Sequence, residues 1–148
     1  MTVEQILEKN IRLAKFETAK TEFVKLPIQM QFDIISKVSY KMESMAVYAF
    51  LCYMIGIDSD PCYHEMAVDI LINTLSFFEG AYSSAYYHAK FLSSLEPDNI
   101  QRKELLLFFF EIPEKLVSEA LAKEIAEDIL NYDHSNITAR RAIARLSK

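Results

Sequence analysis

Glycine and proline are scarce in this sequence of 148 residues. It contains two glycines and four prolines, whereas average usage would give about ten and about seven. An all-β sandwich or barrel needs turn residues between many short strands, so these counts exclude that class. With 51% hydrophobic and 25% charged residues, the composition is that of a globular protein. We predict one all-α domain spanning residues 1–148.

Excess positive charge and long apolar runs are also lacking. The 21 acidic side chains outnumber the 16 basic ones, which argues against a nucleic-acid binder, because such proteins carry a basic stripe. The longest uncharged run, residues 44–57, is shorter than the roughly 18 to 20 residues that cross a bilayer. Residues 1–10 have neither a basic leader nor an apolar core. We therefore expect a cytoplasmic protein with no secretory signal, no membrane partner and two reduced cysteines, Cys52 and Cys62.

Catalytic and cofactor-binding motifs are missing as well. The sequence has no GxSxG, P-loop or GxGxxG motif, and two glycines cannot build a phosphate-binding loop. None of His64, His88 and His134 belongs to an HExxH pair, and Cys62 with His64 supplies too few ligands for zinc. We predict no enzyme activity, no catalytic residue, no metal and no cofactor. The alternative is a small helical enzyme that uses His88 with a carboxylate as general acid and base.

Apolar residues recur with helical spacing along the chain, and caps, first-turn prolines and glycines mark the helix ends. These signals predict about eight helices in antiparallel pairs, over residues 2–14, 27–40, 42–55, 60–78, 82–95, 98–112, 118–131 and 135–146. The side chains expected to cap helices are Thr2, Asp60, Asp98, Ser118 and either Ser135 or Asn136. Gly56 and Gly80 are expected just after the third and fourth helices. The join between Tyr40 and Glu43 is either a break or a bend in one helix.

The sequence also resembles itself when it is shifted by 37 residues. The register aligns Ala85 with Ala122, Ala89 with Ala126, Asn99 with Asn136 and Ile100 with Ile137. An alanine every four residues lets paired helices approach closely. This pattern resembles the tetratricopeptide repeat, a helical pair of about 34 residues, although the Trp and the Gly-Tyr signature of its first helix are missing. The resemblance covers about residues 60–146 and implies a tetratricopeptide-like domain of stacked helical pairs.

Four segments give a second resemblance: residues 46–50, 80–82, 85–89 and 109–116. They resemble small helical immunity proteins encoded beside bacterial polymorphic toxins, including those of contact-dependent inhibition. The resemblance implies a protein that binds and neutralises a cognate toxin domain, with a nuclease, and an RNase in particular, as the favoured partner. An acidic antidote suits a basic nuclease. The repeat signal alone favours an alternative, an adaptor that binds a peptide or protein of the cell.

Tyrosines on one of the predicted helices are the candidate partner-binding residues. Tyr82 and Tyr86 share one helical face, and Tyr87 lies on its flank. Tyrosine combines a large contact area with a hydroxyl group, which suits a protein interface. If the helical pairs stack, Glu79 and Glu111 are expected to add acidic neighbours. Half-buried packing is the alternative for the tyrosines, and a solvated helix face for the glutamates.

Overall fold

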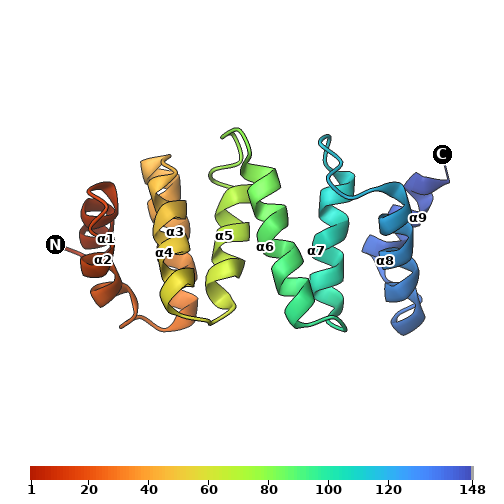
Figure 1. Ribbon diagram of the computed structural model, residues 1–148, viewed down its shortest axis with the longest axis horizontal. Coiled ribbons are helices and arrows are strands. Elements are labelled where there is room, and N and C mark those ends of the chain that lie inside the picture. Colours follow the sequence, from red (N-terminus) through yellow and green to blue (C-terminus); the bar gives the residue numbers. More distant parts are fainter. Residues whose placement is uncertain (148) are drawn as a thin grey trace. The chain divides into compact units, whose positions relative to one another are not determined.

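The structure, a computed structural model, describes residues 1–147 and confirms the all-α, repeat-like prediction (Figure 1). Within these residues there are nine helices and no strand. The helices are α1 (Val3–Arg12), α2 (Phe16–Phe23), α3 (Ile28–Met42), α4 (Ala46–Ile57), α5 (Cys62–Ile72), α6 (Ala81–Leu95), α7 (Ile100–Glu111), α8 (Glu119–Tyr132) and α9 (Ile137–Leu146). In the part of the chain that the structure describes, no helix combines the length and apolar character needed to cross a bilayer.

The chain forms two compact units, Met1–His88 and Ala89–Lys148, and the boundary between them falls within α6. In the first unit, α1 packs against α2 and α4 against α5, while α3 packs against α5. Phe23 of α2 and Phe50 of α4 are fully buried, and their rings meet edge to face with centroids 5.4 Å apart. Burial of one such side chain stabilises a fold by about 1.5 to 3 kcal/mol, so this contact is a principal link between α2 and α4.

The helix α2 was not predicted from the sequence. We expected the first helix to include Ala14, but α1 ends at Arg12 and Ala14 adopts a left-handed conformation with φ of 55°. The next helix begins after Lys15, which makes no side-chain capping hydrogen bond. Because neither position carries glycine, proline or a capping side chain, the sequence contains no marker of this joint.

Other predicted boundaries also need correction, and one open question is settled. Gly56, expected just after the helix predicted over residues 42–55, lies inside α4, which begins at Ala46 and ends at Ile57. The helix predicted over residues 60–78 ends at Ile72, and Gly80, with φ of 81°, precedes α6 instead of ending a long α5. At the end of α5 the side-chain amide of Asn73 donates a hydrogen bond to the backbone carbonyl of Asp69, over 2.9 Å. Such side-chain bonds to the backbone compete with continuation of the helix. The join near Tyr40 to Glu43 is a break, since Glu43 is left-handed with φ of 47°.

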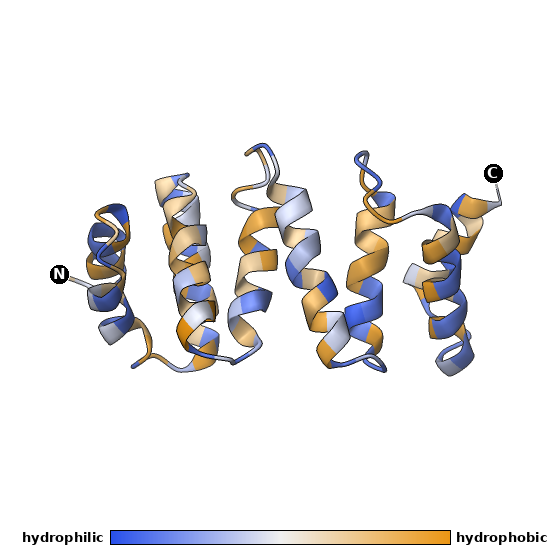
Figure 2. Cartoon of the chain, viewed as in Figure 1, coloured by the Kyte–Doolittle hydropathy of each residue, from blue (hydrophilic) through white to orange (hydrophobic). Residues whose placement is uncertain are grey.

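The second unit contains α7, α8 and α9, each packed against the other two. Ser118 and Asn136 cap α8 and α9 as predicted, by accepting from the backbone N–H groups of Leu121 (3.2 Å) and Ala139 (2.9 Å). The predicted cap of α7 is wrong by one residue, because Asn99 takes this place instead of Asp98. Figure 2 shows that α7 is polar in its first half and apolar in its second. Only Gln101 is exposed in the polar half, where Lys103 is buried.

The alanines aligned by the 37-residue register are all inside the protein. Ala85, Ala89, Ala122 and Ala126 are each 0% exposed. A methyl side chain at a buried position lets the neighbouring helix come close, and any larger side chain there would overpack the contact. The small residues that the repeat pattern singles out are thus packing positions.

Candidate functional site

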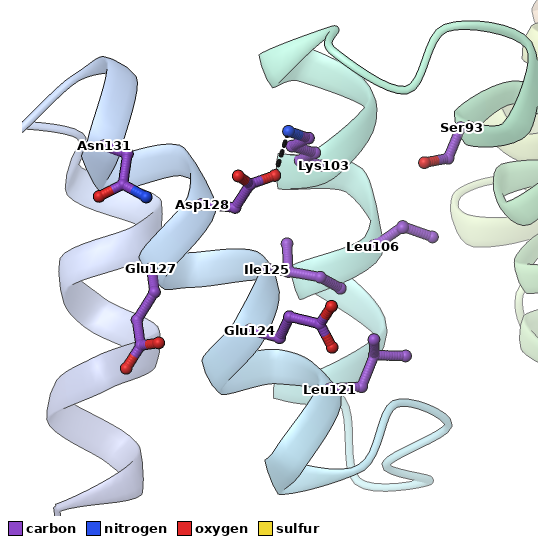
Figure 3. Close-up of a pocket in the computed structure, with 9 residues that line it drawn as sticks. All are labelled: Ser93, Lys103, Leu106, Leu121, Glu124, Ile125, Glu127, Asp128 and Asn131. Carbon is purple, nitrogen blue, oxygen red and sulfur yellow. Dashed lines mark hydrogen bonds and ion pairs between the residues drawn. The ribbon is translucent and has the colours of Figure 1, made fainter.

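A groove in the second unit is the first candidate site (Figure 3). Its volume is about 370 Å³, and it is formed by α7, α8 and the last turns of α6. The lining residues are Ser93, Lys103, Leu106, Leu121, Glu124, Ile125, Glu127, Asp128 and Asn131. Three aliphatic side chains therefore lie beside three carboxylates. This combination suits a ligand with both apolar and basic groups.

Lys103 is the only basic residue among those that line the groove. It is 8% exposed and forms an ion pair with Asp128 (Figure 3). Its Nζ also lies 5.5 Å from the centre of the Tyr132 ring. Asp128 balances the charge of Lys103, and Glu127 forms an exposed ion pair with Lys123 over 3.9 Å. The exposed carboxylate of Glu124 therefore gives the groove its excess negative charge. Sequence reasoning did not single out Lys103, because a lysine on a predicted helix is usually solvated.

The tyrosines predicted as binding residues lie in the first unit, on the first half of α6. Tyr82 and Tyr86 are half-buried, and burial raises the pKa of Tyr86. Tyr87 is 64% exposed, and Glu79 is exposed in the turn before α6. The structure thus leaves Tyr87 accessible to a partner.

Glu111 belongs to the second unit, at the end of α7. Its carboxylate accepts two hydrogen bonds from Arg141 of α9, over 2.7 and 3.2 Å. The Glu111 side chain is only 16% exposed. Glu111 therefore links α7 to α9 through its bonds to Arg141.

Beneath Tyr87, a buried chain of hydrogen bonds links three helices of the first unit. The Nδ1 atoms of His64 and His88 lie 2.9 Å apart, and Nε2 of His88 lies 2.8 Å from the hydroxyl oxygen of Tyr48. The ring of Tyr87 packs edge-on against the imidazole of His88, with centroids 5.3 Å apart. Tyr48 also bonds to Cys52, and burial, together with this bond, raises the pKa of Tyr48. The Tyr48 hydroxyl therefore stays protonated.

The enzyme alternative required a carboxylate beside His88. The hydrogen bonds of His88 run instead to Tyr48 and His64. Burial, with the nearby charge of His64, lowers the pKa of His88 to about 4, and burial lowers that of His64. Both imidazoles are therefore neutral at pH 7. The sequence could not reveal this contact, because it does not give the register between α5 and α6.

The two cysteines are free thiols, as expected. Burial, together with Asp60, raises the pKa of Cys62 to about 12, so this thiol is protonated at pH 7 and a poor metal ligand. Among residues 1–147 no group of three or more His, Cys, Asp or Glu side chains could hold a metal ion.

Comparison with known proteins gives no relative: no protein-family model, curated protein or solved structure matches this chain. The resemblances to tetratricopeptide repeats and to immunity proteins thus rest on the segments quoted from the sequence. The exposed ring of Tyr87 on α6 and the groove between α7 and α8 are the features from which a function can be argued.

Proposed function

We propose that this chain is a binding protein that neutralises a cognate toxin domain, as do the immunity proteins that its sequence resembles. The observation that best supports this is the position of Tyr87, which is 64% exposed while its ring packs edge-on against His88. His88 is 3% exposed and is held by two hydrogen bonds. An aromatic side chain that is already ordered loses little entropy when a partner covers it. Such residues are typical binding hot spots.

Charge supports a basic partner. The chain carries a net charge of −5, and Glu124 places one of its exposed carboxylates at the groove of the second unit. Opposite fields on the two proteins raise the rate of encounter, while apolar burial at the contact sets the rate of dissociation. Neutralisation then needs no reaction: the bound chain covers the active site or the substrate surface of the toxin.

The test is a binding titration against the protein encoded directly upstream. We expect Tyr87→Ala to raise Kd by about 30-fold, which corresponds to a hot spot of about 2 kcal/mol, mainly through faster dissociation. Tyr40→Ala is the matched control, because Tyr40 is 74% exposed on α3 of the same unit. The association rate should fall as ionic strength rises.

Two outcomes would contradict the proposal at different levels. If the two folded proteins do not bind at micromolar concentration, the neutralising function is wrong. If they bind but Tyr87→Ala and Tyr40→Ala have equal effects, the function stands and the surface on α6 is wrong.

The adaptor function is the second candidate, and the groove of the second unit favours it. Its lining combines three aliphatic side chains with three carboxylates, which suits an extended peptide that alternates basic and apolar residues. A labelled peptide of alternating Lys and Leu is a direct probe. Binding that is lost in Glu124→Lys but retained in Glu119→Lys would support this function, because Glu119 is exposed on the same helix but does not line the groove. Equal binding by the two variants would exclude the groove.

A further inference from the structure

The turn that joins α5 to α6, residues 73–80, lies beyond the end of α5 (Figure 1) and carries two phenylalanines. Phe77 is 64% exposed, and Phe78 is half-buried. Their ring centroids lie 4.5 Å apart, and the ring planes are tilted by 30°. Phe78 therefore supports one face of the Phe77 ring, and the large exposed fraction leaves the other face to solvent. Hydration of this apolar ring is unfavourable, and a partner that covered it would remove that cost.

Contacts on both sides of Phe77 fix the conformation of the turn. Leu75 is 0% exposed and anchors the turn in the core. The hydroxyl oxygen of Thr74 lies 2.7 Å from that of Ser39 on α3. The backbone N–H of Phe78 donates to the carbonyl of Leu75 over 3.1 Å. A side chain on such an ordered turn loses little entropy when a partner covers it.

The net negative charge of the chain lies in the segment that contains this turn. Residues 42–89 include six acidic residues and no lysine or arginine, which gives a net charge of −6. By the same count, residues 1–41 carry +2 and residues 90–148 carry −1. Glu79 is the acidic residue nearest to Phe77 in the sequence, and it is exposed. The turn thus places a carboxylate two residues from an exposed aromatic ring.

The lysines of α3, the helix that the turn contacts through Ser39, do not cancel this charge at the turn. Lys37 and Lys41 lie two residues before and after Ser39, so they do not share the helix face on which Ser39 meets Thr74. Lys41 also forms an ion pair with Glu8 of α1, over 2.8 Å.

Charge favours one occupant of this surface over two others. A membrane that contains anionic lipids would repel a segment with six carboxylates. A second copy related by a two-fold axis would set the same acidic segment against itself. A basic segment of another protein is attracted by this charge and can also cover the aromatic ring.

We propose that the α5–α6 turn binds an arginine of a basic protein partner, whose guanidinium stacks on the open face of Phe77 and pairs with the carboxylate of Glu79. A planar guanidinium can make both contacts at once, whereas an ammonium is a more strongly hydrated point charge. Two peptide steps separate the Cα atoms of Phe77 and Glu79, which are therefore at most about 7.6 Å apart. One arginine side chain can span that distance.

This inference rests on the proposed function only for the identity of the partner, the toxin domain. The chemistry of the turn is independent of it, so a peptide can serve as the first probe. The probe is a capped peptide of alternating Arg and Ala, titrated into the full chain and followed by nitrogen–proton NMR. We expect the shifted amides to cluster at residues 74–81. The same peptide with citrulline, which has the shape of arginine without its charge, should bind at least about 10-fold more weakly.

Four variants locate the contact. Phe77→Ala should raise the Kd of the arginine peptide by about 5- to 10-fold. Met30→Ala is its matched control, because Met30 is 52% exposed on α3 of the same unit, and it should leave Kd unchanged. Glu79→Gln should raise Kd more than Glu43→Gln does, which removes the same charge from another exposed position of the acidic segment.

Several results would overturn the arginine contact. Equal affinity for the arginine and citrulline peptides would do so, as would equal effects of Phe77→Ala and Met30→Ala. Sedimentation with phosphatidylserine vesicles that Phe77→Ala abolishes would replace the protein partner by a membrane. A dimer that is seen by analytical ultracentrifugation and lost in Phe77→Ala would replace it by a second copy.

The protein encoded directly upstream separates this inference from the proposed function. If the arginine peptide binds at the turn and the upstream protein does not bind, the neutralising function is wrong and the turn remains an arginine-binding surface. If the upstream protein binds, but Phe77→Ala affects neither ligand more than Met30→Ala does, the function stands and the inference about the turn is wrong.

Discussion

The ion pair at the groove should respond very differently to the removal of one partner or the other. Lys103 is 8% exposed, whereas the side chain of Asp128 is 48% exposed. Asp128→Asn leaves a buried ammonium with a neutral amide and the ring of Tyr132 as its neighbours. Loss of one partner costs about 3 to 5 kcal/mol for a fully buried pair and about 0 to 1 kcal/mol for an exposed one. For this half-buried pair we expect a loss of about 1 to 3 kcal/mol.

Lys103→Met should be much milder. The methionine keeps most of the apolar stem, which is the buried part of the lysine, and the carboxylate of Asp128 that it leaves unpaired can be solvated. We expect a change within about 1 kcal/mol in either direction. The measurement is urea-induced unfolding of both variants at pH 7 and low salt.

A matched control comes from the exposed pair on α8. Lys123 and Glu127 lie 3.9 Å apart with side chains 65% and 58% exposed, so Lys123→Met should change the free energy of unfolding by less than about 0.5 kcal/mol. If Lys103→Met costs as much as Asp128→Asn, the asymmetry is absent. Burial of the ammonium would then not explain the contribution of this pair to the free energy of unfolding.

The remaining predictions concern packing and metal. Ala126→Leu, at a position that is 0% exposed on α8, should overpack the helix contact and lower the free energy of unfolding by about 1 to 3 kcal/mol. Ala120→Leu, at an exposed position of the same helix, should be nearly neutral, and equal urea midpoints for the two variants would count against the close contact. Circular dichroism should show a helical spectrum whose melting temperature a chelator does not shift. A lower melting temperature with chelator would reveal a metal ligand set that the described residues do not form.

Helix ends that are marked by a capping side chain could be predicted from the sequence. Ser118 and Asn136 cap α8 and α9 through bonds to backbone groups three residues ahead, so the signal and the structure lie in one stretch of chain. The start of α2 has no such signal, because an alanine in left-handed conformation turns the chain there. The packing of Phe23 against Phe50 of α4 offsets the conformational cost of the left-handed alanine, and this contact is not local in sequence.

The candidate site could be predicted only in part, because it depends on contacts between helices. Spacing alone places Tyr82 and Tyr86 on one face of α6, and the structure leaves them half-buried. The bond between His64 and His88 joins residues 24 positions apart, and that between Lys103 and Asp128 joins residues 25 apart. Such pairs depend on how one helix is rotated and shifted against the next. No periodicity within a single helix contains this information.

Glu111 shows how this missing information changes an expectation about a single residue. The sequence places it on a helix where a carboxylate is free to meet a basic partner, but its two bonds to Arg141 join α7 to α9. Glu111→Lys would set two cations against each other, so we expect a loss of about 1 to 2 kcal/mol in the free energy of unfolding. The exchanged double variant, Glu111→Arg with Arg141→Glu, should recover most of it.

The matched control for this charge reversal is Glu114→Lys, because Glu114 is exposed in the loop after α7. It makes the same change in net charge and should leave the urea midpoint almost unaltered. If Glu111→Lys were as harmless as Glu114→Lys, the two bonds to Arg141 would not stabilise the second unit, and Glu111 would again be free to serve a partner. If only Glu111→Lys destabilises the protein, any slower association of that variant with the proposed partner must be corrected for its unfolded fraction before it is assigned to charge.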